Sequence, residues 1–345
     1  MSEIIVAGAG HGGLVAAFKL AELGHKVTVY EKFGRENLGH DQKDPVDASF
    51  FDYAGITYPE SWKAPNNVIT LVPIDKDVEP VTLPEENGAT TLIVERRELL
   101  AFLIDLCERA GVNFEFGCEV REPVVLGSRV IGIMTSKGIR LADLVIDACG
   151  IDSPVRRNLP EFMHIQRELG NFDRLHVYRA YYERVEGKPD PQNRYYVYVN
   201  ENGTVGFTWL ITEPDCVDVL IARFPEFTED DIKKNMDFLC QENEHVSRKF
   251  IRGGKVVDIP VRQPLAVFVA DGYAAIGDCA CMTIPIKGSG IGYSIMAGTI
   301  LAKAVEEDTD GLFNCDTLWK YEHDFFRETG FNACTVAVEK NLLPY

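Results

Sequence analysis

Membrane-spanning runs, paired-cysteine motifs and a surplus of basic residues are all missing from this chain. No apolar run approaches the roughly 20 residues that a helix needs to cross a bilayer, and the charged Glu3 does not suit a signal peptide. The nine cysteines include no CxxC and no Cys/His pair at zinc spacing, so we expect neither a metal site nor a disulfide framework. These absences favour a cytoplasmic protein without a membrane span.

Basic residues are outnumbered, with 35 Lys and Arg against 53 Asp and Glu and a formal net charge of -18. Such a charge repels nucleic-acid phosphates and anionic lipid surfaces, so we expect small-molecule partners and no nucleic acid. The 345 residues, 46% of them hydrophobic, suffice for one or two cores. This size suits a two-domain α/β enzyme.

The N-terminus carries a glycine-rich turn between a strand and a helix. Residues 4–7 are apolar, Gly8-Ala9-Gly10-His11-Gly12-Gly13 is a GxGxxG run, and residues 14–23 have helical character and end before Gly24. Glu31 closes the next strand, eighteen residues after Gly13, where an acidic side chain can accept ribose hydroxyls. The pattern predicts a dinucleotide site with its pyrophosphate at the helix N-terminus.

A second glycine-rich turn lies near the other end of the chain. Gly277-Asp278 follows a strand-like stretch, and Pro285 precedes Gly288, Gly290 and Ile291 at the start of an apolar helix. A carboxylate followed by a glycine-rich helix start suits the long ribitol and ring system of FAD, since bare N–H groups favour negative charge there. FAD is therefore favoured over NAD.

Two further segments carry recognisable motifs. Residues 94–99 read Val-Glu-Arg-Arg-Glu-Leu, and residues 142–150 read Ala-Asp-Leu-Val-Ile-Asp-Ala-Cys-Gly before Ser153 and Arg156. Together with the two glycine-rich turns, they resemble the para-hydroxybenzoate hydroxylase-like flavoproteins, and within these the geranylgeranyl reductase family. The resemblance implies an α/β fold: a Rossmann-like FAD-binding domain with an inserted antiparallel-sheet substrate domain.

The resemblance also implies which residues hold FAD without a covalent link, Arg96 by charge-assisted bonds to the pyrophosphate. The full set is Gly8, Gly10, His11, Gly12, Gly13, Glu31, Lys32, Arg96, Val120, Asp278, Pro285, Gly288, Gly290 and Ile291.

A strand-rich middle region interrupts the nucleotide domain. We expect residues 1–165 and 255–345 to form the FAD-binding domain and residues 166–254 the substrate domain, with part of 50–90 contributing. Residues 129–134 and 139–148 are expected to form a hairpin. In the middle region, strand-spaced aromatics suit either ordinary sheet packing or an apolar cavity over the flavin. They are Tyr178, Tyr181, Tyr195, Tyr196, Tyr198, Phe207 and Trp209.

Candidate catalytic residues come from two segments. His40 and Asp41 lie in a polar loop after the second strand and are candidates for proton transfer, with a solvated loop as the alternative. Trp209 is a candidate for the cavity roof because Phe207-Thr208-Trp209 is similar to a reductase motif. Cys279 and Cys281 form either a redox pair or, as we prefer, a buried apolar pair.

The predicted activity is flavin-mediated hydride transfer, with reduction of a carbon–carbon double bond in an apolar or aromatic small molecule. Two alternatives stay open: a flavin monooxygenase of an aromatic or polyketide-like substrate, and a non-catalytic flavin electron carrier or sensor. Since no second GxGxxG exists, NAD(P)H binds transiently or an electron-donor protein replaces it.

Overall fold

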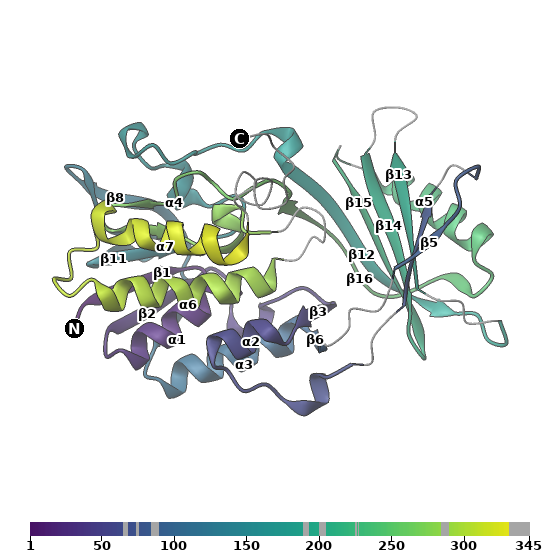
Figure 1. The fold of residues 1–345 in the computed structure, drawn as a ribbon, viewed down its shortest axis with the longest axis horizontal. Coiled ribbons are helices and arrows are strands. Elements are labelled where there is room, and N and C mark those ends of the chain that lie inside the picture. The colour runs from purple at the N-terminus through teal and green to yellow at the C-terminus, as the bar shows by residue number, and fades with distance from the viewer. Residues whose placement is uncertain are drawn as a thin grey trace, which may run out of the picture.

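The computed structural model places a helix-covered, mostly parallel sheet beside a twisted, mostly antiparallel sheet (Figure 1). It describes residues 1–64, 68–73, 76–83, 90–188, 193–199, 205–224, 226, 228–283 and 290–330. The predicted mixed α/β fold with a Rossmann-like domain is confirmed.

The nucleotide half is built on a six-stranded sheet in the order β17-β18-β11-β1-β2-β7. Its strands are β1 (Glu3–Ala7), β2 (Lys26–Glu31), β7 (Asn113–Phe116), β11 (Leu144–Asp147), β17 (Val269–Ala270) and β18 (Tyr273–Ala275). Apart from β17, neighbouring strands are parallel. Residues 4–7 and 144–147 are buried throughout, as expected for central strands covered on both faces.

Helices cover this sheet. They are α1 (His11–Glu22), α2 (Ser49–Ala54), α3 (Arg96–Arg109), α4 (Pro154–Arg157), α6 (Ile291–Glu307) and α7 (Cys315–Thr329). The N-terminal α1 and the C-terminal α6 pack side by side (Figure 1). Glycines permit this close approach, because a Cβ on Gly298 would lie 2.7 Å from the Gly12 carbonyl oxygen. The two predicted cofactor-binding turns are thereby brought together.

The second half is a seven-stranded sheet in the order β16-β12-β15-β14-β13-β4-β5. Its strands are β4 (Ile69–Pro73), β5 (Val81–Thr82), β12 (Arg174–Arg184), β13 (Asn193–Val199), β14 (Val205–Thr212), β15 (Cys216–Arg223) and β16 (Val246–Pro260). Helix α5 (Glu229–Glu242) covers one face with Met236 and Leu239. Strand β16 pairs with β12 as far as Pro260, so the sheet extends beyond the expected domain boundary at residue 254.

Two smaller sheets complete the fold. Strands β8 (Val120–Leu126), β9 (Arg129–Thr135) and β10 (Gly138–Leu141) form one, and β3 (Lys43–Asp47) pairs with β6 (Thr91–Glu95) in the other. Short 3-10 helices are η1 (Arg35–Asn37), η2 (Glu60–Trp62), η3 (Glu161–Met163), η4 (Asn171–Asp173) and η5 (Gly277–Ala280).

The predicted hairpin of residues 129–134 and 139–148 is wrong in its second half. Strand β10 ends at Leu141, and β11 begins at Leu144 in the six-stranded sheet. The two strands are separated at Asp143. Its side chain accepts a hydrogen bond from the Glu3 N–H, and its carbonyl oxygen accepts one from the Arg129 guanidinium. The largely apolar residues 139–148 thus contribute strands to two different sheets, and a hydrophobicity pattern alone does not show where one strand ends and the next begins.

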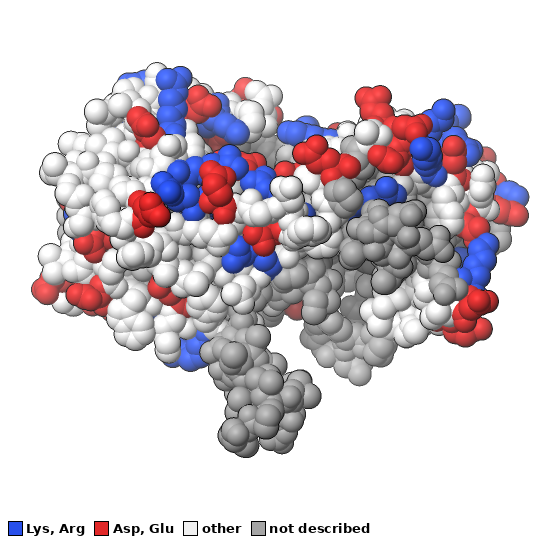
Figure 2. All heavy atoms as spheres, turned by 90° about the horizontal axis from the view of Figure 1, so that it is seen from above, with Lys and Arg blue, Asp and Glu red and all other residues white. Residues whose placement is uncertain are grey.

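No helix in the described part of the chain combines the length and apolar character needed to cross a membrane. Figure 2 shows Lys and Arg interspersed with Asp and Glu over the described residues of one face. Such mixing offers no continuous basic surface on that face for a polyanion.

Candidate functional site

The N-terminus of α1 is open to a ligand. Gly8 adopts a φ of +95°, and a Cβ there would lie 2.6 Å from the Ala148 carbonyl oxygen. A Cβ on Gly13 would lie 2.6 Å from that of Ala148, so both positions require glycine for packing. Gly10 differs, since its Cβ would meet only the Ala148 oxygen, at 3.3 Å. Its backbone is therefore left accessible for close approach by a ligand.

Glu31 shapes this turn. Its Oε2 accepts the Ala9 N–H and its Oε1 accepts the Phe33 N–H, each at 2.9 Å. The side chain is 8% exposed. A carboxylate has about four acceptor positions, so Glu31 retains capacity for the ribose hydroxyls that its position predicts.

His11 is the first residue of α1 and has an unsatisfied atom. Its buried Nε2 has no hydrogen-bond partner among the described residues. Burial, aided by the Arg96 guanidinium, lowers the pKa of His11 to about 3 although the Asp44 carboxylate opposes the shift. The imidazole is therefore neutral near pH 7.

The second glycine-rich turn leads into α6. Pro285 and Gly288 lie outside the described residues, whereas Gly290 is the N-cap and Ile291 the first helical residue. Asp278 in η5 accepts a 2.8 Å bond from the Thr283 hydroxyl. Burial raises the pKa of Asp278, against the Thr283 bond and the Arg96 charge. A Cβ on Gly290 would lie 2.5 Å from the Thr283 Oγ1.

Helices α1 and α6 begin without a side-chain cap, as do α2 and α3. Thr228 caps α5 and Asn314 caps α7 through their side chains. In contrast, α1 and α6 begin after Gly10 and Gly290, which have no side chain to satisfy the first N–H groups. Two positive helix ends thus remain available for an anionic ligand.

A buried network explains the motif at residues 142–156. The Asp147 carboxylate, which is not exposed, accepts bonds from the Ser153 hydroxyl, the Tyr273 hydroxyl and the Arg156 N–H. The Arg156 guanidinium in turn donates to the Cys279 and Ile151 carbonyl oxygens. This motif therefore ties the turn after β11 to η5, and so fixes the backbone around Asp278.

Arg96 begins α3 and forms a two-bond ion pair. Its Nε and Nη2 donate to the two oxygens of Asp44 on β3, each at 2.7 Å. Burial alone would raise the Asp44 pKa, but the Arg96 charge and hydrogen bonds hold it below its usual value. The predicted pyrophosphate ligand Arg96 is thus fixed by Asp44, while Nη1 takes no part in the pair.

The Asp44 carboxylate also contacts the second sheet. Arg179 Nη1 on β12 lies 3.6 Å from Asp44, and its Nε donates to Asp218 on β15 at 2.9 Å. The Arg179 guanidinium also lies 5.0 Å from the centre of the Trp209 ring. Four charged side chains therefore connect the start of α3 with the face of the second sheet that carries Trp209. They are Arg96, Asp44, Arg179 and Asp218.

Sequence reasoning missed Asp44, Arg179 and Asp218 as site residues. Asp44 lies at the end of the loop that contains the candidates His40 and Asp41. Arg179 and Asp218 occupy buried positions in β12 and β15. Opposite charges at core positions of two predicted strands were the available signal.

The seven aromatics do not line one cavity. Tyr178 and Tyr196 belong to the cluster under α5, whereas Trp209 packs with Leu175 and Leu220 on the opposite face. Phe207 and Tyr181 share the face of Trp209, since residues two apart in a strand point the same way. The side chains of Tyr195 and Tyr198 lie outside the described ones. A cavity formed by all seven was therefore wrong, because adjacent strand positions face opposite sides.

The proton-transfer candidates lie beside this junction but are constrained. Asp41 accepts a 2.8 Å bond from Arg252 of β16, which also pairs with Glu95. Burial lowers the pKa of His40 to about 4, with the Arg96 and Lys255 charges adding to the shift. Neutral His40 can accept a proton near pH 7 but holds no extra proton to give. Their catalytic role, like that of Trp209, stays a prediction.

Four further predicted positions are less informative. Lys32 is exposed and its ammonium lies 5.0 Å from the Phe33 ring centre. Val120 is buried at the start of β8, so only its backbone is suited to a polar contact. Cys279 and Cys281 are both free and buried, and burial raises the pKa of Cys281 to about 11.

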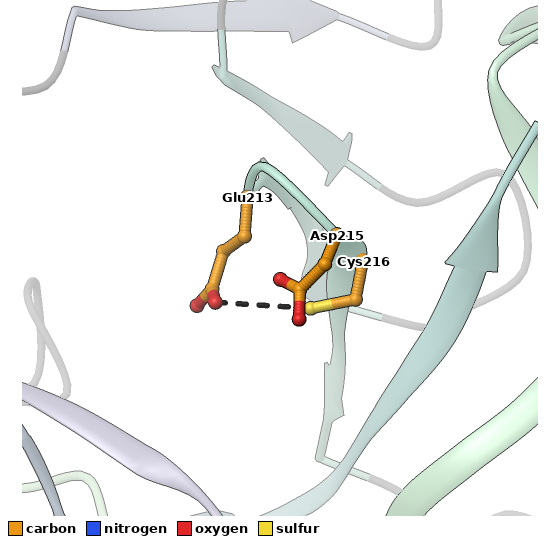
Figure 3. A group of neighbouring side chains, drawn as sticks. All are labelled: Glu213, Asp215 and Cys216. Atoms are coloured by element: carbon orange, nitrogen blue, oxygen red, sulfur yellow. Dashed lines mark hydrogen bonds between the residues drawn. The ribbon is translucent and has the colours of Figure 1, made fainter. Parts of the chain in front are cut away.

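Glu213, Asp215 and Cys216 gather at the turn between β14 and β15 (Figure 3). Cys216 donates to Glu213 at 3.7 Å, and Lys43 forms an ion pair with the same carboxylate. Burial, together with the Glu213 charge, raises the pKa of Cys216 to about 12. A protonated thiol and a carboxylate already paired with an ammonium group give no support for a metal site.

The residues around α1 and α6 fit FAD. The buried Nε2 of His11 needs a partner, Gly10 permits backbone approach, and Arg96 supplies a fixed cation between two bare helix ends. These are the features that a pyrophosphate-containing cofactor requires.

Comparisons with known proteins agree with this assignment. Residues 6–56 match the family model of the NAD(P)-binding Rossmann-like domain. Digeranylgeranylglycerophospholipid reductase 2 of Methanopyrus kandleri is 24% identical over 89% of this chain and 78% of its own length. The Haloferax volcanii digeranylgeranylglycerophospholipid reductase is 22% identical over 88% of this chain and 75% of its own.

Solved structures show the same fold. A geranylgeranyl bacteriochlorophyll reductase-like protein from Thermoplasma acidophilum has a TM-score of 0.79 at 19% identity, covering 95% of this chain and 83% of that one. A probable FAD-dependent monooxygenase from Pseudomonas aeruginosa has a TM-score of 0.69 at 19% identity, covering 94% and 92%. The predicted resemblance to geranylgeranyl reductases within the para-hydroxybenzoate hydroxylase-like flavoproteins is confirmed, and it supports the expectation of an FAD-dependent oxidoreductase.

Proposed function

We propose that this protein reduces a carbon–carbon double bond in an apolar, isoprenoid-type small molecule. The relatives that it matches over most of its length are named as reductases of a digeranylgeranyl lipid. When bound, FAD would supply the hydride. NAD(P)H or an electron-donor protein would provide the electrons.

The observation that carries this proposal is the junction at Asp44. Its carboxylate lies between Arg96, at the cofactor end, and Arg179, which is stacked near Trp209. Beyond Arg179, the same face offers Leu175, Val177 and Phe207 to an apolar substrate. The charge network of Arg96, Asp44 and Arg179 thus connects the proposed cofactor site with the apolar face of the second sheet.

Each part has a distinct task. The N-termini of α1 and α6 and the Arg96 guanidinium would hold the negatively charged cofactor. The face of β12, β14 and β15 would exclude water and orient the alkene, with Trp209 as its largest ring. Because His40 is neutral near pH 7, a water molecule would supply the proton that completes the reduction.

The test is an anaerobic assay with purified, FAD-loaded protein. Geranylgeranyl-type alkenes should oxidise the chemically reduced protein and appear as products heavier by two hydrogens per double bond, measured by mass spectrometry. The monooxygenase alternative predicts oxygen consumption and a product heavier by one oxygen. Flavin cycling that no such substrate accelerates would favour the electron carrier and contradict reduction.

A further inference from the structure

Arg252 on β16 connects the two halves of the molecule. Its Nη1 donates to Asp41 Oδ1 at 2.8 Å and to Glu95 Oε2 at 2.9 Å, and its Nη2 donates to Glu95 Oε1 at 2.7 Å. Asp41 lies in the loop before β3, and Glu95 is the last residue of β6. A planar guanidinium that binds two carboxylates at once is held in one orientation. Arg252 of the second sheet therefore fixes a loop and a strand of the nucleotide half.

Tyr181 of β12 adds a second contact to the same loop. The Arg252 guanidinium lies over the Tyr181 ring, 4.1 Å from its centre, where a cation is attracted to the aromatic face. The hydroxyl of Tyr181, which is not exposed, accepts the Lys43 N–H at 2.8 Å. The Lys43 ammonium in turn forms an ion pair with Glu213, at the turn between β14 and β15. The loop is thus held from the second sheet on both sides of Gln42.

The backbone of β16 is irregular around Arg252. The pairing of β16 with β12 shifts register on both sides of the pair formed by Arg252 and Tyr181. Gly253, the next residue, has a φ of +87°, and a Cβ there would lie 2.7 Å from the Arg179 carbonyl oxygen. Bulges re-aim a side chain, and glycine permits the backbone conformation that this one needs. The irregular backbone thus accompanies a side chain directed toward the nucleotide half.

The segment of residues 40–44 borders the proposed cofactor site. Its last residue, Asp44, accepts two bonds from the Arg96 guanidinium, and the Gln42 carbonyl oxygen accepts the Arg96 N–H at 2.9 Å. Its first residue, His40, is half-buried and lies near the Arg96 charge. Movement of this segment would therefore displace the cation that we expect at the pyrophosphate and would expose His40 to water.

We propose that Arg252 is a positioning residue, which holds residues 40–44 beside the cofactor site from the second sheet. It acts through Asp41, Glu95 and Tyr181 and touches neither the cofactor nor the reacting atoms. Because β16 belongs to the sheet that would carry the substrate, the same contacts fix how that sheet lies against the cofactor end. The inference rests on the proposed function for its effect on turnover, whereas the position of the segment can be measured without FAD.

The first measurement follows the ring protons of His40 by NMR during a pH titration of the cofactor-free protein. The signal is assigned by its loss in His40→Gln. Burial is the main cause of the low pKa of His40, about 4, so a segment released into water should show a pKa closer to the ordinary value of about 6.5. The charged and titratable groups that face this ring are Arg96 and Arg97 of α3, Lys255 of β16, Asp44 of β3 and His11 of α1.

Two substitutions separate the position of the segment from its charge. Arg252→Gln removes a cation and Asp41→Ala removes an anion, so charge alone would raise the His40 pKa in the first variant and lower it in the second. Release of the segment raises it in both. Arg252→Lys keeps the charge but lacks the planar group that binds two carboxylates. Arg248→Gln is the matched control, because Arg248 lies on the same strand and pairs with Asp237 of α5.

We expect the His40 pKa to rise by about 1 or more in both Arg252→Gln and Asp41→Ala, and by less in Arg252→Lys. Arg248→Gln should match the original protein. In the FAD-loaded protein, Arg252→Gln should lower kcat for an isoprenoid alkene by about ten- to a hundredfold, as expected when groups at a site are displaced by about 1 Å. The KM for the alkene should change little, since Arg252 does not bind it.

Four results would overturn the assignment: a lower or unchanged His40 pKa in Asp41→Ala, an Arg252→Lys variant that behaves as the original protein, an equal effect of Arg248→Gln, or an unchanged kcat in Arg252→Gln. The proposed function fails separately. If the His40 pKa changes as expected but the FAD-loaded original protein reduces no isoprenoid alkene, the positioning role of Arg252 stands and the proposed reductase activity does not.

Discussion

Asp44 and Arg96 form a two-bond ion pair, each bond 2.7 Å long, although they are 52 residues apart in the chain. The carboxylate is 7% exposed as a side chain, and Arg179 approaches it from the second sheet. Asp44 thus contacts guanidinium groups from different halves of the molecule, and Arg179 is also paired with Asp218.

Asp44→Asn should be strongly destabilising because it leaves Arg96 and Arg179 close together without their shared anion. Removing one partner of a buried pair costs about 3–5 kcal/mol. Asp41→Asn is the control, since Asp41 pairs with Arg252 at the surface, where a pair contributes about 0–1 kcal/mol. Urea unfolding of both variants checks the difference. Equal losses would mean that Asp44 has no special structural role.

The cofactor-free protein should lose stability in mild acid. The pKa of His11 is about 3 when folded and near 6.5 when unfolded. As pH falls below 6.5 the unfolded chain binds the proton first, so this group lowers the unfolding free energy until pH reaches the folded pKa. From pH 6.5 to 5 the loss approaches about 2 kcal/mol. His11→Leu should flatten this slope in urea titrations, and an unchanged slope would contradict a buried neutral imidazole.

Gly10→Val should remove FAD while preserving the fold. Among the described residues, a Cβ at this position would meet only the Ala148 oxygen, at 3.3 Å, but the side chain would occupy the space where the backbone must approach the pyrophosphate. Flavin absorbance and far-UV circular dichroism give the two readings. If the folded variant retained stoichiometric FAD, the assignment of the cofactor to this turn would be wrong.

Trp209→Ala should leave FAD content intact and sharply lower turnover. The ring contributes to the apolar face of the second sheet and lies beside Arg179, away from the glycine turn. Trp209→Phe, which retains an aromatic ring, should recover part of the rate. Parallel losses of flavin, rate and melting temperature would instead make Trp209 a core residue only.

Gly290→Val should lower the flavin reduction potential by tens of millivolts or abolish FAD binding. Its Cβ would lie only 2.5 Å from the Thr283 hydroxyl oxygen, so the new side chain would displace that hydroxyl and move the start of α6 away from the ligand. About 30 mV corresponds to 1.4 kcal/mol for two electrons. Thr283→Val separates loss of the Asp278 hydrogen bond from displacement of the helix. An unchanged potential at full occupancy would show that the turn does not touch the ring.

Local sequence patterns predicted those parts of the fold that depend on residues close together in the sequence. The strand, glycine turn and helix at residues 3–22 follow from periodicity and from the backbone freedom of Gly8. Asp44 could not be found in this way, because it lies on the short strand β3, which has little periodic context, and its partners Arg96 and Arg179 are remote in sequence. The face occupied by each aromatic of β12 and β13 likewise depends on where α5 packs, which strand propensity does not encode.

The direct test of the central assignment is the cofactor content of the purified and FAD-reconstituted protein. We expect one FAD per chain, released unchanged by acid and absent from Gly10→Val, with reduction by dithionite that is reversed by an isoprenoid alkene without oxygen. A protein that binds no FAD after reconstitution, or binds a nicotinamide dinucleotide in its place, would contradict the assignment.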